Sequence, residues 1–256
     1  FRRKLLLEES ALQLVCENEE VRKMLKRIKA LQGNEANVLV TGESGVGKEL
    51  LAKVIHKHSN RREYPFVKVN CSVISTDNFV DALCGSQADL SAKPGLFALA
   101  EGGTLFFDHI EKLDLPSQLQ LAEVVRSGQY PVGGELEFRA LNARLIASSS
   151  ANLTELVDQG KFNEELYYLV NIMDFHLEPL RRRREDIMPI ANYFLERFSH
   201  ETNKRFKGFT IEVTNIFTRY DWPGNVRELE NVVERAVFSA DRVNIGAKFL
   251  PVGMKY

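Results

Sequence analysis

The sequence contains few cysteines, no long apolar run and almost no net charge. Three cysteines (Cys16, Cys71 and Cys84) are scattered, odd in number and without metal-ligand spacing. This pattern fits a reduced cytosolic protein better than a disulfide scaffold. No apolar run approaches the length of a membrane span and no signal peptide is visible, so we expect a cytoplasmic protein without a membrane partner. With a net charge of −1, the chain lacks the excess of positive charge that is typical of nucleic-acid-binding domains. Any binding of nucleic acid would therefore need a separate domain.

The composition is that of a soluble globular protein. Hydrophobic residues make up 44% and charged residues 27%, which are ordinary values. The 256 residues suffice for one large domain, or for a large and a small one. The sequence begins at Phe1 rather than Met, which suggests that it was taken from a longer protein.

Short apolar runs alternate with amphipathic segments over the first two thirds of the chain. Helical spacing and turn signals predict helices over 17–32, after the glycine-rich turn that follows Thr41, over 77–83 and over 116–127. Apolar runs bounded by turn residues predict strands at 37–41, 66–70, 104–107, 144–147 and 171–175. This alternation predicts an α/β fold in which helices flank a parallel sheet.

The pattern changes after Pro179. Three segments read as helices without intervening strands: 185–200, 210–220 and 223–240. We therefore expect two domains, an α/β nucleotide-binding domain over 1–176 and a small all-helical domain over 177–256.

A phosphate-binding loop follows the first predicted strand. Its residues match G-x-x-x-x-G-K and are Gly42, Glu43, Ser44, Gly45, Val46, Gly47 and Lys48. Glycines let successive backbone N–H groups converge on a phosphate, the following helix adds its dipole, and the lysine adds a positive charge. Glu49 stands where the motif usually has the Ser or Thr that ligates Mg²⁺. The alternative is a tight glycine turn that binds nothing.

The motifs in order resemble those of one family. They are LVCENEEVRKML, GESGVGKELLAKVIHKHSNRREYPFVKVNC, PGLFALAEGGTLFFDH, KFNEELYYLVN, PLRRRREDI and YDWPGNVRELENVVERAV. Together they resemble the central AAA+ domain of the bacterial enhancer-binding proteins, ATPases that remodel σ54 RNA polymerase. The resemblance implies a P-loop AAA+ core followed by a helical lid, with ATP and Mg²⁺ as ligands. It also implies that Asp108 organises the Mg²⁺, and a Glu after the loop lysine, as at Glu49, is usual in this family.

Several positions depart from the family pattern. The Asp-Glu pair of the Walker B motif, whose Glu positions the attacking water, is here Asp108-His109, and Glu111 is not expected to reach the same place. The two arginines that the family supplies to a neighbouring subunit align with Asn163 and Leu169, and the polar sensor I position falls at Ser150. Because loss of an arginine finger can lower the rate by roughly 10³–10⁵, we expect no catalytic residues and a domain that no longer hydrolyses ATP.

The loop with which the family contacts σ54 also differs. The family places a GAFTGA loop before the Pro-Gly that precedes Walker B. Here Leu83-Cys84-Gly85 is followed only by SQADLSAK before Pro94-Gly95. This interval is several residues shorter, so we expect the σ54-contacting loop to be deleted.

Two basic features are candidate ligand contacts. Arg227 aligns with sensor II, where a lid arginine would reach the phosphates; the alternative is a surface partner for Glu230 or Glu234 at helical spacing. Arg181–Arg184 form a basic run, which favours a solvated face over an anionic ligand or a subunit contact.

These features predict a regulatory module of a DNA-binding transcription factor, similar to the biofilm-matrix regulators of the VpsR type. ATP or cyclic di-GMP would set its oligomeric state as a dimer or ring, and it would act on σ70 rather than σ54 RNA polymerase. DNA would be bound by a domain outside this segment. Relatives that bind cyclic di-GMP use an Arg-Asn pair that aligns here with Lys53-Val54, so a cyclic dinucleotide site would be built differently. The alternatives are a slow ATPase that remodels RNA polymerase and a nucleotide-free dimerisation scaffold.

Overall fold

The structure is a computed structural model that describes residues 16–30, 33–86, 93–132, 137–240 and 244–254. The chain divides into two compact units. The sheet unit comprises Arg27–Gly42 and Lys48–His176. The helical unit comprises the described parts of Phe1–Lys26 and Leu177–Tyr256, together with Glu43–Gly47.

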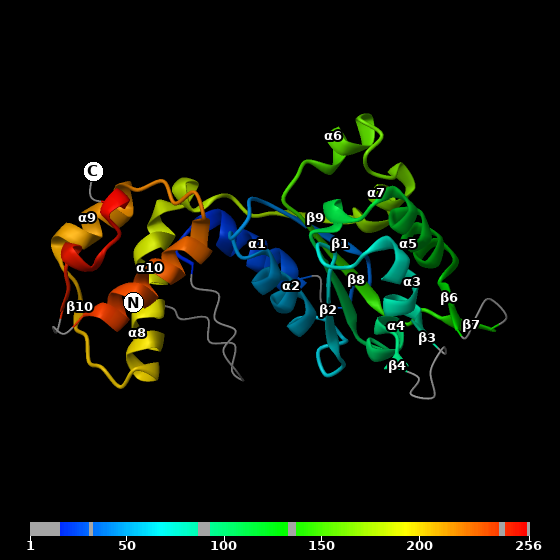
Figure 1. Ribbon diagram of the computed structural model, residues 1–256, viewed down its shortest axis with the longest axis horizontal. Coiled ribbons are helices and arrows are strands. Elements are labelled where there is room, and N and C mark those ends of the chain that lie inside the picture. The colour runs from blue at the N-terminus through cyan, green and yellow to red at the C-terminus, as the bar shows by residue number, and fades with distance from the viewer. Residues whose placement is uncertain (1–15, 31–32, 87–92, 133–136, 241–243, 255–256) are drawn as a thin grey trace. The chain divides into compact units, whose positions relative to one another are not determined.

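Five parallel strands form the centre of the sheet unit (Figure 1). Their order in the sheet is β2-β5-β8-β1-β9. They are β1 (Val38–Thr41), β2 (Phe66–Asn70), β5 (Thr104–Asp108), β8 (Arg144–Ser149) and β9 (Met173–His176). All five overlap the strands predicted from the sequence, and the predicted parallel α/β sheet is confirmed. Strand β8 lies third of the five in this order and is buried along its whole length.

Helices cover both faces of this sheet, with α2 on one side and α3, α5 and α7 on the other (Figure 1). On the second side Leu105 and Phe107 of β5 pair in register with Leu145 and Ala147 of β8, and all four belong to one hydrophobic core. The helices of the unit are α2 (Lys48–Lys57), α3 (Thr76–Cys84), α4 (Leu96–Leu99), α5 (Leu115–Ser127), α6 (Leu153–Asp158) and α7 (Glu164–Val170). Helix α1 (Glu19–Ala30) contributes its last turn.

Two small antiparallel pairs in the sheet unit have no counterpart among the predicted elements. They are β3 (Gly85–Ser86) with β4 (Lys93–Pro94), and β6 (Gln129–Val132) with β7 (Glu137–Ala140). Strand β7 is exposed at all four residues, so it has no apolar pattern from which a strand could be recognised.

The helical unit is built around α8 (Ile187–Glu201), α9 (Ile211–Arg219) and α10 (Asn225–Ser239). The three predicted helices of this region are therefore confirmed. The expectation that strands are absent was wrong, because two-residue strands β10 (Gly208–Phe209) and β11 (Asn244–Ile245) pair in parallel. The indole of Trp222 is completely buried in the core of the unit, and its Nε1 donates to the Phe217 carbonyl oxygen at 2.8 Å. Among the described helices, none has the length and apolar character needed to cross a membrane.

Candidate functional site

The phosphate loop lies where β1 ends and α2 begins. The carboxyl ends of parallel strands meet at one edge of a sheet, which is where ligands bind in open α/β folds. Three glycines of the loop, Gly42, Gly45 and Gly47, have φ of 144°, 79° and 109°. These values lie in the region that side chains disfavour, so the loop path requires glycine at all three positions.

Lys48 is the first residue of α2 and its side chain reaches the end of β8. Its Nζ donates to the Gly42 carbonyl oxygen and to Ser150 Oγ, both at 2.7 Å. Lys48 is 5% exposed, while Ser150 directly follows β8 and is exposed. The structure thus brings the loop lysine and the sensor I position into direct contact.

Asp108 ends β5 and both of its carboxylate oxygens have donors. Oδ1 accepts from Ser148 Oγ at 2.6 Å, and Oδ2 lies 2.8 Å from Lys68 Nζ. The same ammonium lies 2.7 Å from Glu49 Oε2. Burial raises the pKa of Asp108, but the hydrogen bonds from Lys68 and Ser148 outweigh this effect and leave the pKa below its usual value.

Lys68 was not among the predicted site residues. The signal that could have found it is a charged residue at the centre of FVKVN, the second predicted strand. Strand β2 pairs with β5 so that Asn70 lies opposite Asp108, and this register brings the Lys68 side chain to the Asp108 carboxylate.

Asp108 is the carboxylate at this edge that aligns with the magnesium residue of the family. Mg²⁺ in nucleotide sites is commonly held by one or two carboxylates, substrate phosphates and water. Asp108 fits such a shared role, in which the phosphates and water supply most of the ligands. Among the described residues no group of three or more His, Cys, Asp or Glu side chains could hold a metal by itself.

His109 and Glu111 follow Asp108 and turn back towards Ser150. His109 has φ 60° and ψ 51°, a left-handed conformation that is uncommon for a non-glycine residue. A single 3-10 turn, Ile110–Lys112, then places Glu111 Oε1 3.2 Å from the Ser150 backbone nitrogen and 3.4 Å from His109 Nδ1. Glu111 therefore contacts Ser150, the residue whose hydroxyl accepts from Lys48.

The two residues that align with the family's arginines make structural contacts within the sheet unit. Asn163 caps α7, because its side-chain oxygen accepts from the Leu166 backbone N–H at 2.7 Å. Leu169 is partly buried against the core of the sheet unit, and its carbonyl oxygen accepts from Asn37 Nδ2 at 2.8 Å.

In the helical unit, the tip of the phosphate loop is bonded to the first residues of α10. The Gly45 carbonyl oxygen accepts from the backbone N–H groups of Val226, at 3.0 Å, and Arg227, at 3.3 Å. Asn225 Nδ2 donates to the Ser44 carbonyl oxygen at 3.0 Å. A Cβ at Gly45 would lie 2.4 Å from the Gly224 carbonyl oxygen, so a side chain does not fit there. The contact of Arg227 with nucleotide phosphates stays a prediction.

The four arginines after Leu180 have four different surroundings. Arg181 pairs with Glu43 through two hydrogen bonds, of 2.8 and 2.5 Å, and these lower the pKa of Glu43 to about 2. Arg182 and Arg184 are exposed, with partners at Glu178 and Asp221 respectively.

We expected all four arginines to face the solvent, but Arg183 is buried. Its guanidinium donates to the Val46 carbonyl oxygen at 2.7 Å and lies 3.9 Å from Asp186. Burial lowers the pKa of Arg183 and raises that of Asp186, each of which is stabilised by the charge of the other. The repeated arginines in the sequence give no sign that one of them faces inward.

The positions aligned with a cyclic di-GMP pair have other partners. Lys53 lies 2.7 Å from Glu49 Oε1, and Val54 is 1% exposed in the core. Binding of cyclic di-GMP stays a prediction.

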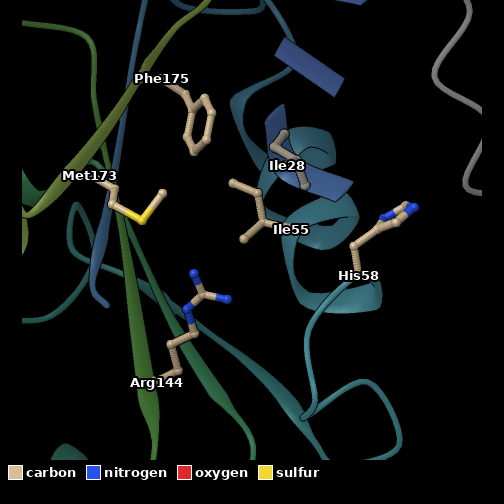
Figure 2. Close-up of a pocket in the computed structure, with 6 residues that line it drawn as sticks. All are labelled: Ile28, Ile55, His58, Arg144, Met173 and Phe175. Carbon is tan, nitrogen blue, oxygen red and sulfur yellow. The ribbon is translucent and has the colours of Figure 1, made fainter. Parts of the chain in front are cut away.

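A small pocket lies at the opposite edge of the sheet, where strands begin. Arg144 and Met173 are the first residues of β8 and β9, and Figure 2 shows both directed towards Ile55 of α2. Arg144 Nε donates to the Ala36 carbonyl oxygen at 3.1 Å, and burial lowers the pKa of Arg144. The pocket is thus separate from the edge that carries Lys48.

Comparison with known proteins identifies the family. The Sigma-54 interaction domain family matches residues 14–176, which is more than half of the chain. The chain belongs to this family. Residues 181–256 match the AAA+ ATPase lid domain, so the predicted AAA+ core with a helical lid is confirmed, as is the resemblance to the σ54-dependent activators.

Relatives are similar along nearly the whole chain. The phenol regulator MopR of Acinetobacter guillouiae is 39% identical over 232 residues, covering 89% of this chain and 41% of MopR. The transcriptional regulatory protein ZraR of Klebsiella oxytoca is 36% identical over 247 residues, covering 94% of this chain and 56% of ZraR. The chain spans about half the length of these relatives.

The fold is also that of a nucleotide-bound relative. NtrX from Brucella abortus in complex with ADP has a TM-score of 0.87 and 26% identity, covering 96% of this chain and 57% of NtrX. The same protein has been solved in complex with ATP, with a TM-score of 0.86 and 27% identity over 94% of this chain and 57% of NtrX.

These matches correct one expectation from the sequence. We expected a domain that is not an ATPase, and this was wrong, because the chain belongs to a family of AAA+ ATPases and has the fold of an ATP-bound relative. We had expected His109, Ser150, Asn163 and Leu169 to leave the site without catalytic groups, and Glu111 to lie outside it. In the structure Ser150 contacts Lys48 through its hydroxyl, and Glu111 contacts the Ser150 backbone N–H.

Proposed function

We propose that this chain is the ATP-binding and ATP-hydrolysing module of a DNA-binding transcription regulator. Nucleotide occupancy would set the oligomeric state of the regulator, and a domain outside this segment would bind DNA. Phosphate contacts would come from Gly42 to Lys48, with Arg227 as the lid arginine and Asp108 as the magnesium carboxylate.

The observation that carries the proposal is the position of Lys48. Its ammonium is held at the carboxyl edge of the sheet between a loop carbonyl and the Ser150 hydroxyl, each 2.7 Å away. A buried cation at the start of a helix that follows a glycine loop is the arrangement that binds β- and γ-phosphates. The ATP and ADP complexes of NtrX support the choice of adenine nucleotide.

Titration calorimetry and phosphate release together test the proposal. We expect ATP to bind with Mg²⁺ present, and both binding and turnover to be lost in Lys48→Ala. Lys57→Ala is the matched control, since it removes a lysine from the last turn of the same helix. Cyclic di-GMP is titrated separately. A binding curve for cyclic di-GMP alone, or turnover that survives Lys48→Ala, would contradict the proposal.

We propose in addition that the module acts on RNA polymerase without a GAFTGA contact, and so with σ70 rather than σ54. Strands β3 and β4 pair antiparallel, and residues 87–92, which join them, read QADLSA. The predicted loop deletion falls on these residues, which lie outside the described part of the chain. The full-length regulator should activate transcription by σ70 polymerase and not by σ54 polymerase, and activation of σ54 polymerase alone would contradict this.

Oligomeric state is tested by sedimentation of the full-length regulator. We expect ATP to shift the protein from a dimer towards a larger assembly, and Lys48→Ala to remove the shift. A sedimentation profile that is identical with and without ATP would support a nucleotide-free scaffold instead.

A further inference from the structure

The Glu111 carboxylate is buried beside the phosphate-loop lysine and is incompletely paired. Its side chain is 5% exposed, and Oε1 accepts from the Ser150 backbone N–H at 3.2 Å. Oε2 is buried and has no hydrogen-bond partner among the described residues. A buried polar oxygen of this kind needs a donor, and an ordered water commonly supplies it.

The neighbours of Glu111 connect it to the phosphate site. Ser150, whose N–H holds Oε1, presents its hydroxyl to Lys48 Nζ at 2.7 Å. The lysine of a phosphate loop contacts the β- and γ-phosphates. Ser150 thus connects the Glu111 carboxylate, on which a water would bind, to Lys48, which would hold the terminal phosphate.

We propose that Glu111 is the catalytic carboxylate of ATP hydrolysis in this chain, in place of the glutamate that the family carries at the position of His109. The inference rests on the proposed ATPase function. Water bound to Glu111 attacks the γ-phosphorus and transfers a proton to the carboxylate. The new P–O bond forms as the bond to the β–γ bridging oxygen breaks, ADP leaves with the electron pair, and the proton passes to the released phosphate.

The conformation around His109 explains how a residue two places further along takes this role. The left-handed backbone at His109 and the single 3-10 turn after it reverse the chain immediately after β5. Glu111 thereby reaches the Ser150 backbone N–H at the end of β8, while the His109 side chain is 26% exposed. The His109 imidazole is then a neighbour of the carboxylate and is not required for proton transfer.

Isosteric substitution tests this assignment. Glu111→Gln keeps an oxygen for the Ser150 N–H and removes the proton acceptor. General-base catalysis typically contributes roughly 10²–10⁴ in rate, so we expect ATP turnover to fall by about a hundredfold or more while ATP binding measured by calorimetry is retained. Glu123→Gln, an exposed glutamate on α5, is the matched control and should keep full turnover.

A double variant tests whether Glu111 has a catalytic role and not only a structural one, because only a catalytic carboxylate could be replaced by one at a neighbouring position. His109→Glu combined with Glu111→Gln moves the carboxylate to the family's position, and we expect it to recover turnover relative to Glu111→Gln alone. His109→Ala should retain turnover.

Failure of this inference can be told apart from failure of the proposed function. Turnover that depends on Lys48 but survives Glu111→Gln, or that is lost in His109→Ala alone, would overturn the inference and leave the ATPase function standing. Absence of Lys48-dependent turnover in the unmodified protein would overturn both.

Discussion

The guanidinium of Arg183 donates a 2.7 Å hydrogen bond to the carbonyl oxygen of Val46 in the phosphate loop. Both residues belong to the helical unit, and Arg183 is 4% exposed. The loop tip is therefore held by a buried cation of the lid segment through its backbone, in addition to the bonds from Asn225, Val226 and Arg227.

Replacing Arg183 should strongly destabilise the helical unit. Arg183→Met leaves Asp186, which is completely buried, without its nearest cation, and breaking a buried ion pair by removing one partner costs about 3–5 kcal/mol. We expect a loss of about 3 kcal/mol in the free energy of unfolding, measured by urea denaturation. Arg182→Met, at the exposed neighbour, should change it by less than about 0.5 kcal/mol.

The same pair offers a compensating variant. Asp186→Asn added to Arg183→Met removes the buried charge, and part of the lost free energy of unfolding should return. A double variant less stable than Arg183→Met would argue against charge burial as the cause.

The pairing of Arg181 with Glu43 should give the stability a defined dependence on pH. The pairing lowers the pKa of Glu43 from 4.5 to about 2. Because the folded pKa is the lower one, the contribution is present above the unfolded value and is lost as pH falls from about 4.5 towards about 2. The stability difference between the unmodified protein and Glu43→Gln should therefore shrink across this window in urea titrations.

The control for this prediction is Glu178→Gln, which removes a carboxylate paired with the exposed Arg182. A difference between unmodified protein and Glu43→Gln that stays constant from neutral to acidic pH would contradict the assignment.

Asn163 should contribute to stability as a helix cap. Loss of an N-cap side chain costs about 1 kcal/mol, so Asn163→Ala should lower the free energy of unfolding by that amount. Asn163→Asp, which keeps an acceptor for the Leu166 N–H, should stay close to the unmodified protein. Thermal denaturation of both variants checks this, and equal melting temperatures for the two would exclude a capping role.

Trp222 should be a strong determinant of the helical unit. It packs edge-on against Phe217 and Tyr220, with ring centroids 5.2 Å apart in both cases. Trp222→Phe removes the donor to the buried Phe217 carbonyl oxygen, and an unsatisfied buried group costs about 1–3 kcal/mol. We expect a loss of about 2 kcal/mol in urea denaturation followed by circular dichroism.

Tyr220→Phe is the comparison for Trp222→Phe. It removes a hydroxyl that donates to Glu228 Oε1 at 3.0 Å in a partly exposed setting, so the loss should be smaller, about 1 kcal/mol or less. A larger loss for Tyr220→Phe than for Trp222→Phe would contradict this ranking.

The central sheet could be predicted from the sequence because short apolar runs mark its strands, as in β1 and β5, where every residue but the last is buried. Strand β7 could not, since its residues are exposed. The position of Glu111 depends on a positive φ at His109, and a non-glycine residue gives no local signal for that conformation. Burial of Arg183 among four consecutive arginines likewise depends on packing between segments distant in the sequence, Val46 and Asp186.

A glycine-rich loop is ordinarily explained by the ligand that it surrounds. At Gly45 the explanation is different, because a Cβ there would lie 2.4 Å from the Gly224 carbonyl oxygen. At Gly47 a Cβ would meet nothing within 4 Å, and the backbone conformation alone requires glycine. The glycines of one motif thus meet two independent requirements. Gly45 is needed for packing within the chain, so its presence alone does not indicate that a phosphate is bound.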